Sequence, residues 1–282
     1  MARIALEDNF TDILGKAQRG RRMADGELAR RAGVSTAQLK EAKSGRIDEA
    51  VVRSLASVLG LGADALVASA QRVWEPKEQG EIDGFAMFTT PFGDMTVNAY
   101  LVFDPKTRQV AAFDTGADAD PMLQFIRDKQ LHLELILLTH THTDHVFDLD
   151  RLKKSASADA FVSEREPLTG STPFPDGKTF TLGALTIETR RTSGHARGGT
   201  TFVVTGLAQR LAVVGDALFA GSMGGGMVDY EEALRTNRAG IFTSPDDTIV
   251  CPGHGPLTTV GEEKAHNPFF PEFHQQQAGQ QQ

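Results

Sequence analysis

The stretch of sequence that decides the fold is Thr139-His140-Thr141-His142-Thr143-Asp144-His145. It places three histidines and one aspartate within six residues, directly after the strand-sized apolar run 131–138. The chain has 282 residues and only eight histidines, so this grouping is much denser than chance would give. Imidazole and carboxylate groups are ligands that divalent first-row metals take in proteins. The stretch therefore predicts a metal site in a loop at the end of a buried strand.

Three further candidate ligands stand in separate loops that are bounded by glycines or strands. They are His195 in Ser193-Gly194-His195, Asp216 after a strand expected at 211–214, and His254 in Pro252-Gly253-His254. A single histidine is more often a hydrogen-bonded polar residue than a ligand, and a Gly-Asp pair after a strand is usually a turn. Together with the first stretch, however, they supply five histidines and two aspartates. That set is large enough to hold two metal ions.

The sequence from about residue 85 onward mixes short strands with amphipathic helices. Strands are expected at 96–103, 109–114, 131–138, 180–190, 200–205, 211–214 and 249–250, and helices at 121–129 and 147–155. This mixture predicts an α+β domain over residues 85–274. The Gln-rich residues 275–282 predict a disordered tail.

Residues 1–72 have a different, wholly helical pattern, with apolar residues three and four positions apart. Gly33 is expected to end one helix and Ser35 to cap the next, and Gly45 and Asp48 form a similar pair of stop and start signals. The segment therefore predicts a compact bundle of four or five short helices. The polar residues 73–84, with one proline and two glycines, predict a linker to the larger domain.

Composition and charge narrow the class of protein. No apolar run approaches the roughly 18–20 residues that span a bilayer, and no secretory signal is visible, so we expect a cytoplasmic protein without a membrane partner. The single cysteine, Cys251, cannot form an internal disulfide and is expected to be a small buried residue.

Charge is divided unevenly along the sequence. The net charge of the chain is −8, yet residues 1–72 hold 12 basic and 9 acidic residues and so carry a net charge of +3. The two parts are therefore expected to have different partners.

The H-x-H-x-D-H pattern at 140–145, followed by the three later candidates, resembles the metallo-β-lactamase superfamily over about residues 85–270. The resemblance implies an αββα sandwich with metal ions at one edge of its two sheets. It implies that one ion is held by His140, His142 and His195, that a second is held by Asp144, His145 and His254, and that Asp216 bridges both. Asp114, in Asp114-Thr115-Gly116, is a candidate acceptor for a ligand histidine, or else a turn residue.

Two divalent ions, with zinc as the first choice and iron or manganese as alternatives, would activate a bridging water near neutral pH. Asp144 and Asp216 are then the catalytic carboxylates that balance the charge of the ions. An aspartate at 216 resembles the short glyoxalase-II-like hydrolases, which implies a small thioester or ester substrate. Glyoxalase II carries a C-terminal helical domain that supplies basic groups for glutathione, whereas only 28 residues follow His254 here. We therefore do not expect the resemblance to extend to glutathione specificity. Arg197 is a candidate for holding a substrate carboxylate, or else a surface ion pair.

Residues 27–40 resemble the helix-turn-helix of phage-repressor-like regulators. The resemblance implies DNA contacts from Thr36, Gln38, Lys40 and Lys43, and a homodimer if the operator has two-fold symmetry. The modest net charge of this part and Glu41 on the same helix leave a protein-docking role open. Two alternatives for the whole chain also stay open, namely a persulfide dioxygenase with one iron and a transcriptional regulator that senses a metabolite.

Overall fold

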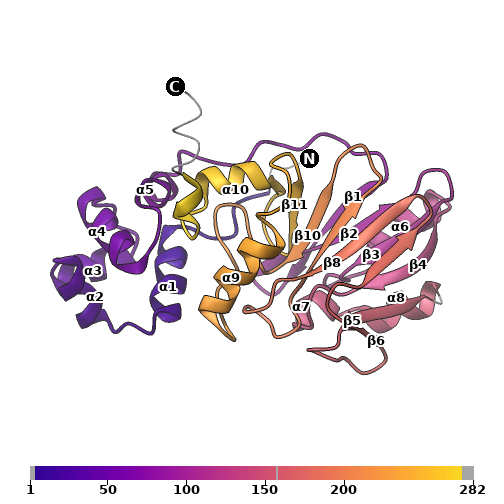
Figure 1. The fold of residues 1–282 in the computed structure, drawn as a ribbon, viewed down its shortest axis with the longest axis horizontal. Helices are drawn as coiled ribbons and strands as arrows, with labels where there is room; N and C mark the ends of the chain where they lie inside the picture. Colours follow the sequence, from indigo (N-terminus) through magenta and orange to yellow (C-terminus); the bar gives the residue numbers. More distant parts are fainter. Residues whose placement is uncertain (1–3, 157, 275–282) are drawn as a thin grey trace.

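The computed structural model describes residues 4–156 and 158–274. A helical head, drawn in indigo and purple in Figure 1, lies beside a sandwich of two sheets with helices on both outer faces. The predicted tail at 275–282 lies outside the described residues. Among the residues described, no helix is both long enough and apolar enough to cross a membrane.

The first sheet has the strand order β1-β2-β3-β4-β5-β6. Its first three strands are antiparallel, and β3 to β6 run parallel. The strands are β1 (Phe85–Phe92), β2 (Met95–Phe103), β3 (Gln109–Phe113), β4 (His132–Leu137), β5 (Asp159–Ser163) and β6 (Thr172–Phe174).

The second sheet has the order β12-β11-β10-β9-β8-β7, in which only β10 and β11 are parallel. Its strands are β7 (Thr179–Leu182), β8 (Leu185–Arg191), β9 (Thr200–Thr205), β10 (Leu211–Gly215), β11 (Ile249–Pro252) and β12 (Thr258–Thr259).

Five helices form the head and five more, with one 3-10 turn, belong to the sandwich part of the described chain. The head contains α1 (Phe10–Gly20), α2 (Asp25–Ala32), α3 (Thr36–Lys43), α4 (Glu49–Leu59) and α5 (Ala63–Gln71). The sandwich part contains α6 (Asp120–Asp128), α7 (Thr143–Val146), α8 (Leu149–Ala156), α9 (Tyr230–Gly240), α10 (Val260–His266) and the turn η1 (Pro271–Phe273).

The alternation of side chains along the strands explains why four layers form. In β3, Ala111 and Phe113 join the core between the two sheets, whereas Val110 and Ala112 face the opposite way and pack with α6 and α8. Successive side chains of a strand point to opposite faces, so strands that are apolar on both faces must be covered on both. Cys251 lies in the core between the sheets, as expected for a small buried residue.

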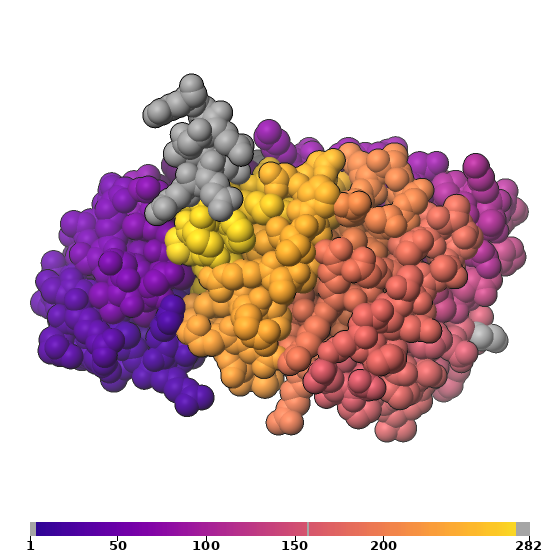
Figure 2. Space-filling model, viewed as in Figure 1, coloured from indigo at the N-terminus to yellow at the C-terminus, as the bar shows by residue number. Residues whose placement is uncertain are grey.

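The head does not stand apart from the sandwich. One hydrophobic cluster joins buried residues of α1 to α5 with residues of β10, α9 and the segment after α10, including Val214, Leu234 and Phe270. Gly20 at the end of α1 lies so close to Tyr230 that a Cβ there would be 2.2 Å from the tyrosine ring. Figure 2 shows the two parts in continuous contact. The helices of the head therefore share a core with one outer face of the sandwich.

The linker predicted at 73–84 has no helix or strand as far as Ile82, yet it is held against α10. Trp74 stacks on His266 with ring centroids 4.7 Å apart, and the Lys77 N–H donates to Glu262 Oε1 at 2.9 Å. Composition predicted the lack of regular structure. It could not predict the docking, because the partners lie 185 residues or more away in the sequence.

Most predicted elements lie where the periodicity placed them, with shifts of one or two residues at their ends. The single strand predicted at 180–190 was wrong, because Gly183 takes a left-handed turn at φ 57 and divides the segment into the hairpin of β7 and β8. The helical prediction at 147–155 began too early, since α8 starts at Leu149. The caps Gly33, Ser35 and Asp48 are confirmed.

Candidate metal centre

Loops from both sheets bring the seven predicted ligands to one edge of the sandwich. His140 and His142 lie between β4 and α7, and Asp144 and His145 lie in α7 itself. His195 follows β8, Asp216 follows β10, and His254 follows β11. All seven are buried except His142 and Asp144, which are partly exposed. Loops that leave a packed sheet at the same edge can hold side chains in fixed mutual positions.

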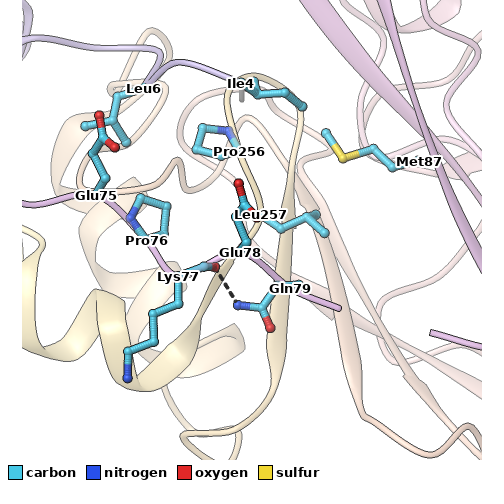
Figure 3. Close-up of a pocket in the computed structure, with 10 residues that line it drawn as sticks. All are labelled: Ile4, Leu6, Glu75, Pro76, Lys77, Glu78, Gln79, Met87, Pro256 and Leu257. Atoms are coloured by element: carbon cyan, nitrogen blue, oxygen red, sulfur yellow. Dashed lines mark hydrogen bonds between the residues drawn. The ribbon is translucent and has the colours of Figure 1, made fainter. Parts of the chain in front are cut away.

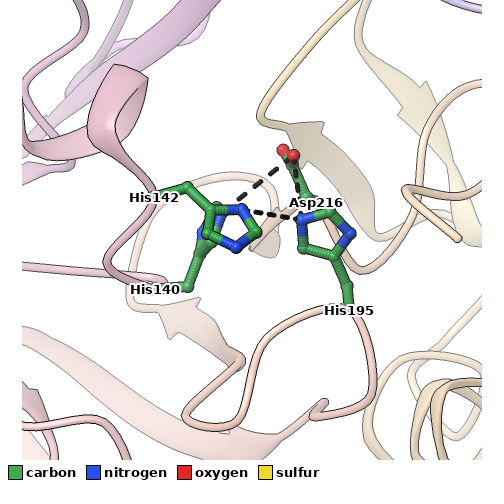
Figure 4. Close-up of side chains that lie close together, drawn as sticks. All are labelled: His140, His142, His195 and Asp216. Carbon is green, nitrogen blue, oxygen red and sulfur yellow. Dashed lines mark hydrogen bonds and ion pairs between the residues drawn. The ribbon is translucent and has the colours of Figure 1, made fainter. Parts of the chain in front are cut away.

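The first donor group consists of His140, His142, His195 and Asp216, whose ligand atoms lie within 4.8 Å of one another. Figure 4 shows the three imidazole rings and the carboxylate turned toward a common point. His195 Nε2 lies 3.0 Å from His142 Nδ1 and 3.3 Å from Asp216 Oδ2. Three imidazoles and one carboxylate are a donor set that suits zinc or iron.

The second donor group consists of Asp144, His145 and His254. Asp144 Oδ2 lies 3.5 Å from His145 Nε2 and 3.2 Å from His254 Nε2. The two groups are neighbours, since the rings of His140 and His145 have centroids 4.2 Å apart.

Asp216 of the first group turns one oxygen to the histidines of that group and the other to the second group. Its Oδ2 faces His195 of the first group, whereas its Oδ1 lies 3.2 Å from His145 Nε2 and 3.5 Å from His254 Nε2 of the second. A carboxylate in this position can bridge two cations.

The hydrogen bonds of the imidazole Nδ1 atoms also fit metal binding. Each of four histidines directs Nδ1 to an oxygen outside the cluster: His140 to Thr139 Oγ1, His145 to Asp114 Oδ2, His195 to the Gly224 carbonyl and His254 to the Thr96 carbonyl. Because carbonyl and carboxylate oxygens can only accept, the Nδ1 atoms that face them donate, which directs the Nε2 lone pairs to the cluster.

Three polar atoms of the cluster are buried without a hydrogen-bond partner among the described residues: Nε2 of His140, Nε2 of His145 and Oδ1 of Asp216. Buried polar atoms without partners are what a cation-binding site leaves when the cation is absent.

Charge and burial shift the pKa values in opposite directions within this cluster. Burial lowers the pKa of His140 well below its usual range. Burial also disfavours a charged His145, but the neighbouring Asp216 and Asp114 outweigh it and raise the pKa of His145 to about 10. Burial raises the pKa of Asp216, yet His145 and His254 together hold it well below the ordinary value. Strongly perturbed groups gathered at one buried point are typical of a functional site.

Two carboxylates outside the donor groups hold the ligand loops. Asp114 accepts from His145 and also from the Thr139 N–H and hydroxyl, each at 2.7 Å, as the sequence suggested for an acceptor. Glu166 was missed by the sequence analysis. Its Oε1 accepts from the N–H and hydroxyl of Thr141, between His140 and His142, while Oε2 accepts from the Gly198 N–H in the His195 loop at 2.6 Å. No motif marks Glu166, because its role depends on two loops meeting in space.

The remaining candidates of the sequence analysis lie outside the donor groups. Arg197 is exposed two residues after His195, and no ion pair involves it in the described part of the chain. Thr36, Gln38, Lys40 and Lys43 are exposed on α3, far along the chain from the metal ligands. Lys43 pairs with Asp25 at 2.8 Å, and Gln38 accepts from the Ser35 N–H at 2.9 Å.

A separate groove of about 300 Å³ lies beside the loop that follows His254. The N-terminal residues Ile4 and Leu6, the linker residues 75–79 and Pro256 and Leu257 line it, as Figure 3 shows. It contains none of the seven candidate ligands, so the chemistry of the cluster does not extend into it.

Comparison with known proteins now identifies the family. A family model described as the metallo-beta-lactamase superfamily matches residues 92–254. The chain belongs to the metallo-beta-lactamase superfamily. This membership agrees with the two sheets and with the position of the cluster at their edge. The helical head lies outside the matched residues.

Relatives of this superfamily member include enzymes. A Streptococcus pyogenes protein named a probable metallo-hydrolase is 32% identical over 199 residues, which are 61% of this chain and 84% of that protein. Hydroxyacylglutathione hydrolase GloC of Haemophilus influenzae is 32% identical over 198 residues, covering 61% of this chain and 92% of that one. The crystal structure of TTHA1623 in a di-iron-bound form is 26% identical with a TM-score of 0.52, and covers 64% of this chain and 99% of that chain.

Proposed function

We propose that this protein is a binuclear metallohydrolase that cleaves a small thioester or ester, with glyoxalase-II-like hydrolysis as the nearest description. The observation that carries the proposal is the position of Asp216, whose two carboxylate oxygens face the two donor groups. The relative named hydroxyacylglutathione hydrolase and the related di-iron structure support the reaction class and the two ions.

Under this proposal His140, His142 and His195 hold one ion, Asp144, His145 and His254 hold the other, and Asp216 bridges them. Zinc is the first choice, with iron or manganese as alternatives. When bound, the ions would supply a hydroxide nucleophile near neutral pH and polarise the carbonyl of the substrate.

The chain's own residues would orient these groups. Asp114, Thr139 and the Gly224 carbonyl hold the imidazole rings through Nδ1, so that Nε2 is directed to the cluster. Asp144, one of the two proposed catalytic carboxylates, is partly exposed and therefore accessible to solvent. We propose that Arg197, which is exposed and lies two residues after His195, holds a substrate carboxylate.

Metal analysis combined with a substrate panel tests the proposal. The purified full chain should contain two divalent ions and hydrolyse a small thioester or ester. Asp216→Asn should lose at least one ion and more than about a hundredfold in activity, because second-sphere changes alone cost 10–100-fold. Asp176→Asn is a matched control, since Asp176 pairs with Arg165 at the surface. One iron per chain, with oxygen uptake on a persulfide, would contradict hydrolysis and favour the dioxygenase alternative.

For the head we propose that α3 binds DNA, and that the protein forms a homodimer if the DNA operator has two-fold symmetry. The supporting observation is that α2 and α3 are joined through Gly33, which has a left-handed φ of 68, and that the four candidate contacts on α3 are exposed.

The full chain should bind duplex DNA with an affinity that falls steeply as the salt concentration rises, and Lys40→Gln should reduce the slope of that dependence. Lys153→Gln, outside the head, serves as control. Absence of binding, or binding that salt does not change, would favour a protein-docking role instead. Any effect of a small thioester or ester on DNA affinity would indicate the metabolite-sensing regulator.

A further inference from the structure

A cavity of about 630 Å³ lies where α1 of the head meets the glycine-rich loop between Asp216 and α9. Its lining residues come from two segments: Lys16, Arg19, Gly20 and Arg22 from the head, and residues 224–231 from the loop and the start of α9. The volume is in the range of small-molecule sites. Neither segment would form this cavity without the other.

The charges in this cavity leave two cations without a carboxylate. Arg19 and Arg22 have no ion pair or side-chain hydrogen bond within residues 4–156 and 158–274. The acidic lining residues are already engaged, since Glu231 pairs with Arg21 at 2.9 Å and Asp229 accepts from the Glu232 N–H at 2.9 Å to cap α9. Lys16 pairs with Asp8 and donates to the Met223 carbonyl at 2.8 Å.

The loop adds backbone donors to these cations. The N–H groups of Gly225, Gly226 and Met227 have no acceptor among the described residues, whereas that of Gly224 donates to Asp216 O at 3.0 Å. Guanidinium groups and free backbone N–H groups are all donors, and together they match an acceptor-only group such as a carboxylate or phosphate.

The cavity also adjoins the metal cluster. Gly224, which lines it, accepts from Nδ1 of His195 at 3.0 Å through its carbonyl. A Cβ at Gly224 would be 2.7 Å from that nitrogen and 2.2 Å from the Asp216 carbonyl oxygen, so the loop is held tightly against both residues. A ligand of this loop would therefore contact the segment that orients a candidate metal ligand.

We infer that the junction of the head and the glycine-rich loop is a binding site for the anionic group, carboxylate or phosphate, of a small metabolite. Arg19 and Arg22 supply the charge, and the N–H groups of Gly225 to Met227 complete the donor set. The site depends on the head, which gives α1 a role in ligand binding that is independent of α3.

Calorimetric titration of the metal-free full chain with inorganic phosphate tests the inference, since removing metal excludes coordination of phosphate by bound ions. The double variant Arg19→Gln/Arg22→Asn should weaken phosphate binding at least about tenfold, because hydrogen bonds to charged groups each contribute about that much. Asn suits position 22, where φ is 51. The control Arg30→Gln/Arg210→Gln removes two exposed arginines outside the cavity and should bind as the parent does. No saturable binding by the parent, or equal binding by the double variant, would overturn the inference.

A second arm identifies the source of the anion. If the group belongs to the substrate, phosphate should compete with an ester that carries a terminal acid, and the double variant should raise KM for that ester about tenfold while leaving a neutral ester unchanged. If the anion is a separate ligand, phosphate should change turnover of both esters alike. The titration needs no catalysis, so its failure and the failure of the hydrolase proposal are distinguishable.

Discussion

Asp114 Oδ2 lies 2.8 Å from His145 Nδ1, and the opposite nitrogen of the same ring lies 3.2 Å from Asp216 Oδ1. The imidazole is thus held between a carboxylate behind it and the donor cluster in front. Asp114 also accepts from the Thr139 hydroxyl, which in turn lies 3.0 Å from His140 Nδ1. One buried carboxylate therefore supports a histidine of each donor group.

Asp114→Asn should weaken metal binding and lower activity by about 10–100-fold, because the amide is neutral and its NH2 group cannot accept from the histidine. Asn is compatible with the left-handed backbone at Asp114, where φ is 56, so the fold should persist. Metal titration and circular dichroism measure the two effects separately. Unchanged metal affinity would show that Asp114 acts only as a turn residue.

Glu166→Gln should give a loss of similar size, about 10–100-fold in metal affinity. The variant keeps the shape of the side chain, but one of its two accepting oxygens becomes an NH2 group that cannot accept from Thr141 or Gly198. The two ligand loops should therefore be less firmly joined. Glu164→Gln, two residues earlier and exposed, is the matched control. Equal metal affinities for the two variants would refute the positioning role of Glu166.

Gly20→Ala should destabilise the full chain by about 1–3 kcal/mol, because the added Cβ would overlap the ring of Tyr230 across the contact between head and sandwich. Gly26→Ala is the control, since nothing lies within 4 Å of that position in α2. It should instead stabilise by up to about 1 kcal/mol, as Ala does relative to Gly in a helix. Urea unfolding measures both. Equal effects of the two substitutions would contradict the close contact.

The ionisation of Glu263 should lower the free energy of unfolding as pH rises, which is the opposite of the usual effect of a carboxylate. Burial raises its pKa from 4.5 to about 8, although donors from Asn267, Gly221 and Thr258 oppose the shift. Between pH 4.5 and 8 the folded chain would hold a proton that the unfolded chain has lost. Its contribution to stability should therefore decline as pH rises, by up to about 1.4 kcal/mol per pH unit.

Glu263→Gln removes that titration, so the free energy of unfolding of the metal-free variant should change less between pH 5.5 and 7.5 than that of the parent. Chemical denaturation at both pH values, in the presence of a chelator, makes the comparison. Parallel pH profiles would mean that the three donors keep Glu263 ionised in the folded chain.

Much of the fold followed from local signals. The periodicity of apolar residues predicted four or five helices in the head, where the structure has five, and most strands of the sandwich. The caps at Gly33, Ser35 and Asp48 marked helix ends. The strands β1, β5, β6 and β12 and the helices α9 and α10 were not predicted. For β6 and β12 the reason is their length, because two or three residues carry too little pattern to distinguish a strand from a loop. The hairpin at Gly183 was missed because a single glycine in an alternating run is ambiguous.

The sequence by itself determined which residues can bind metal, because imidazole and carboxylate side chains grouped at 140–145 are a chemical signal that needs no neighbours. Only the tertiary structure decided how they are used. The division of Asp216 between two donor groups, the support of Asp114 and Glu166, and the cavity between Arg22 and the glycine-rich loop all join residues far apart in the chain. Such contacts depend on how the sheets and helices pack, and packing is set by side chains from the whole chain at once rather than by any local stretch.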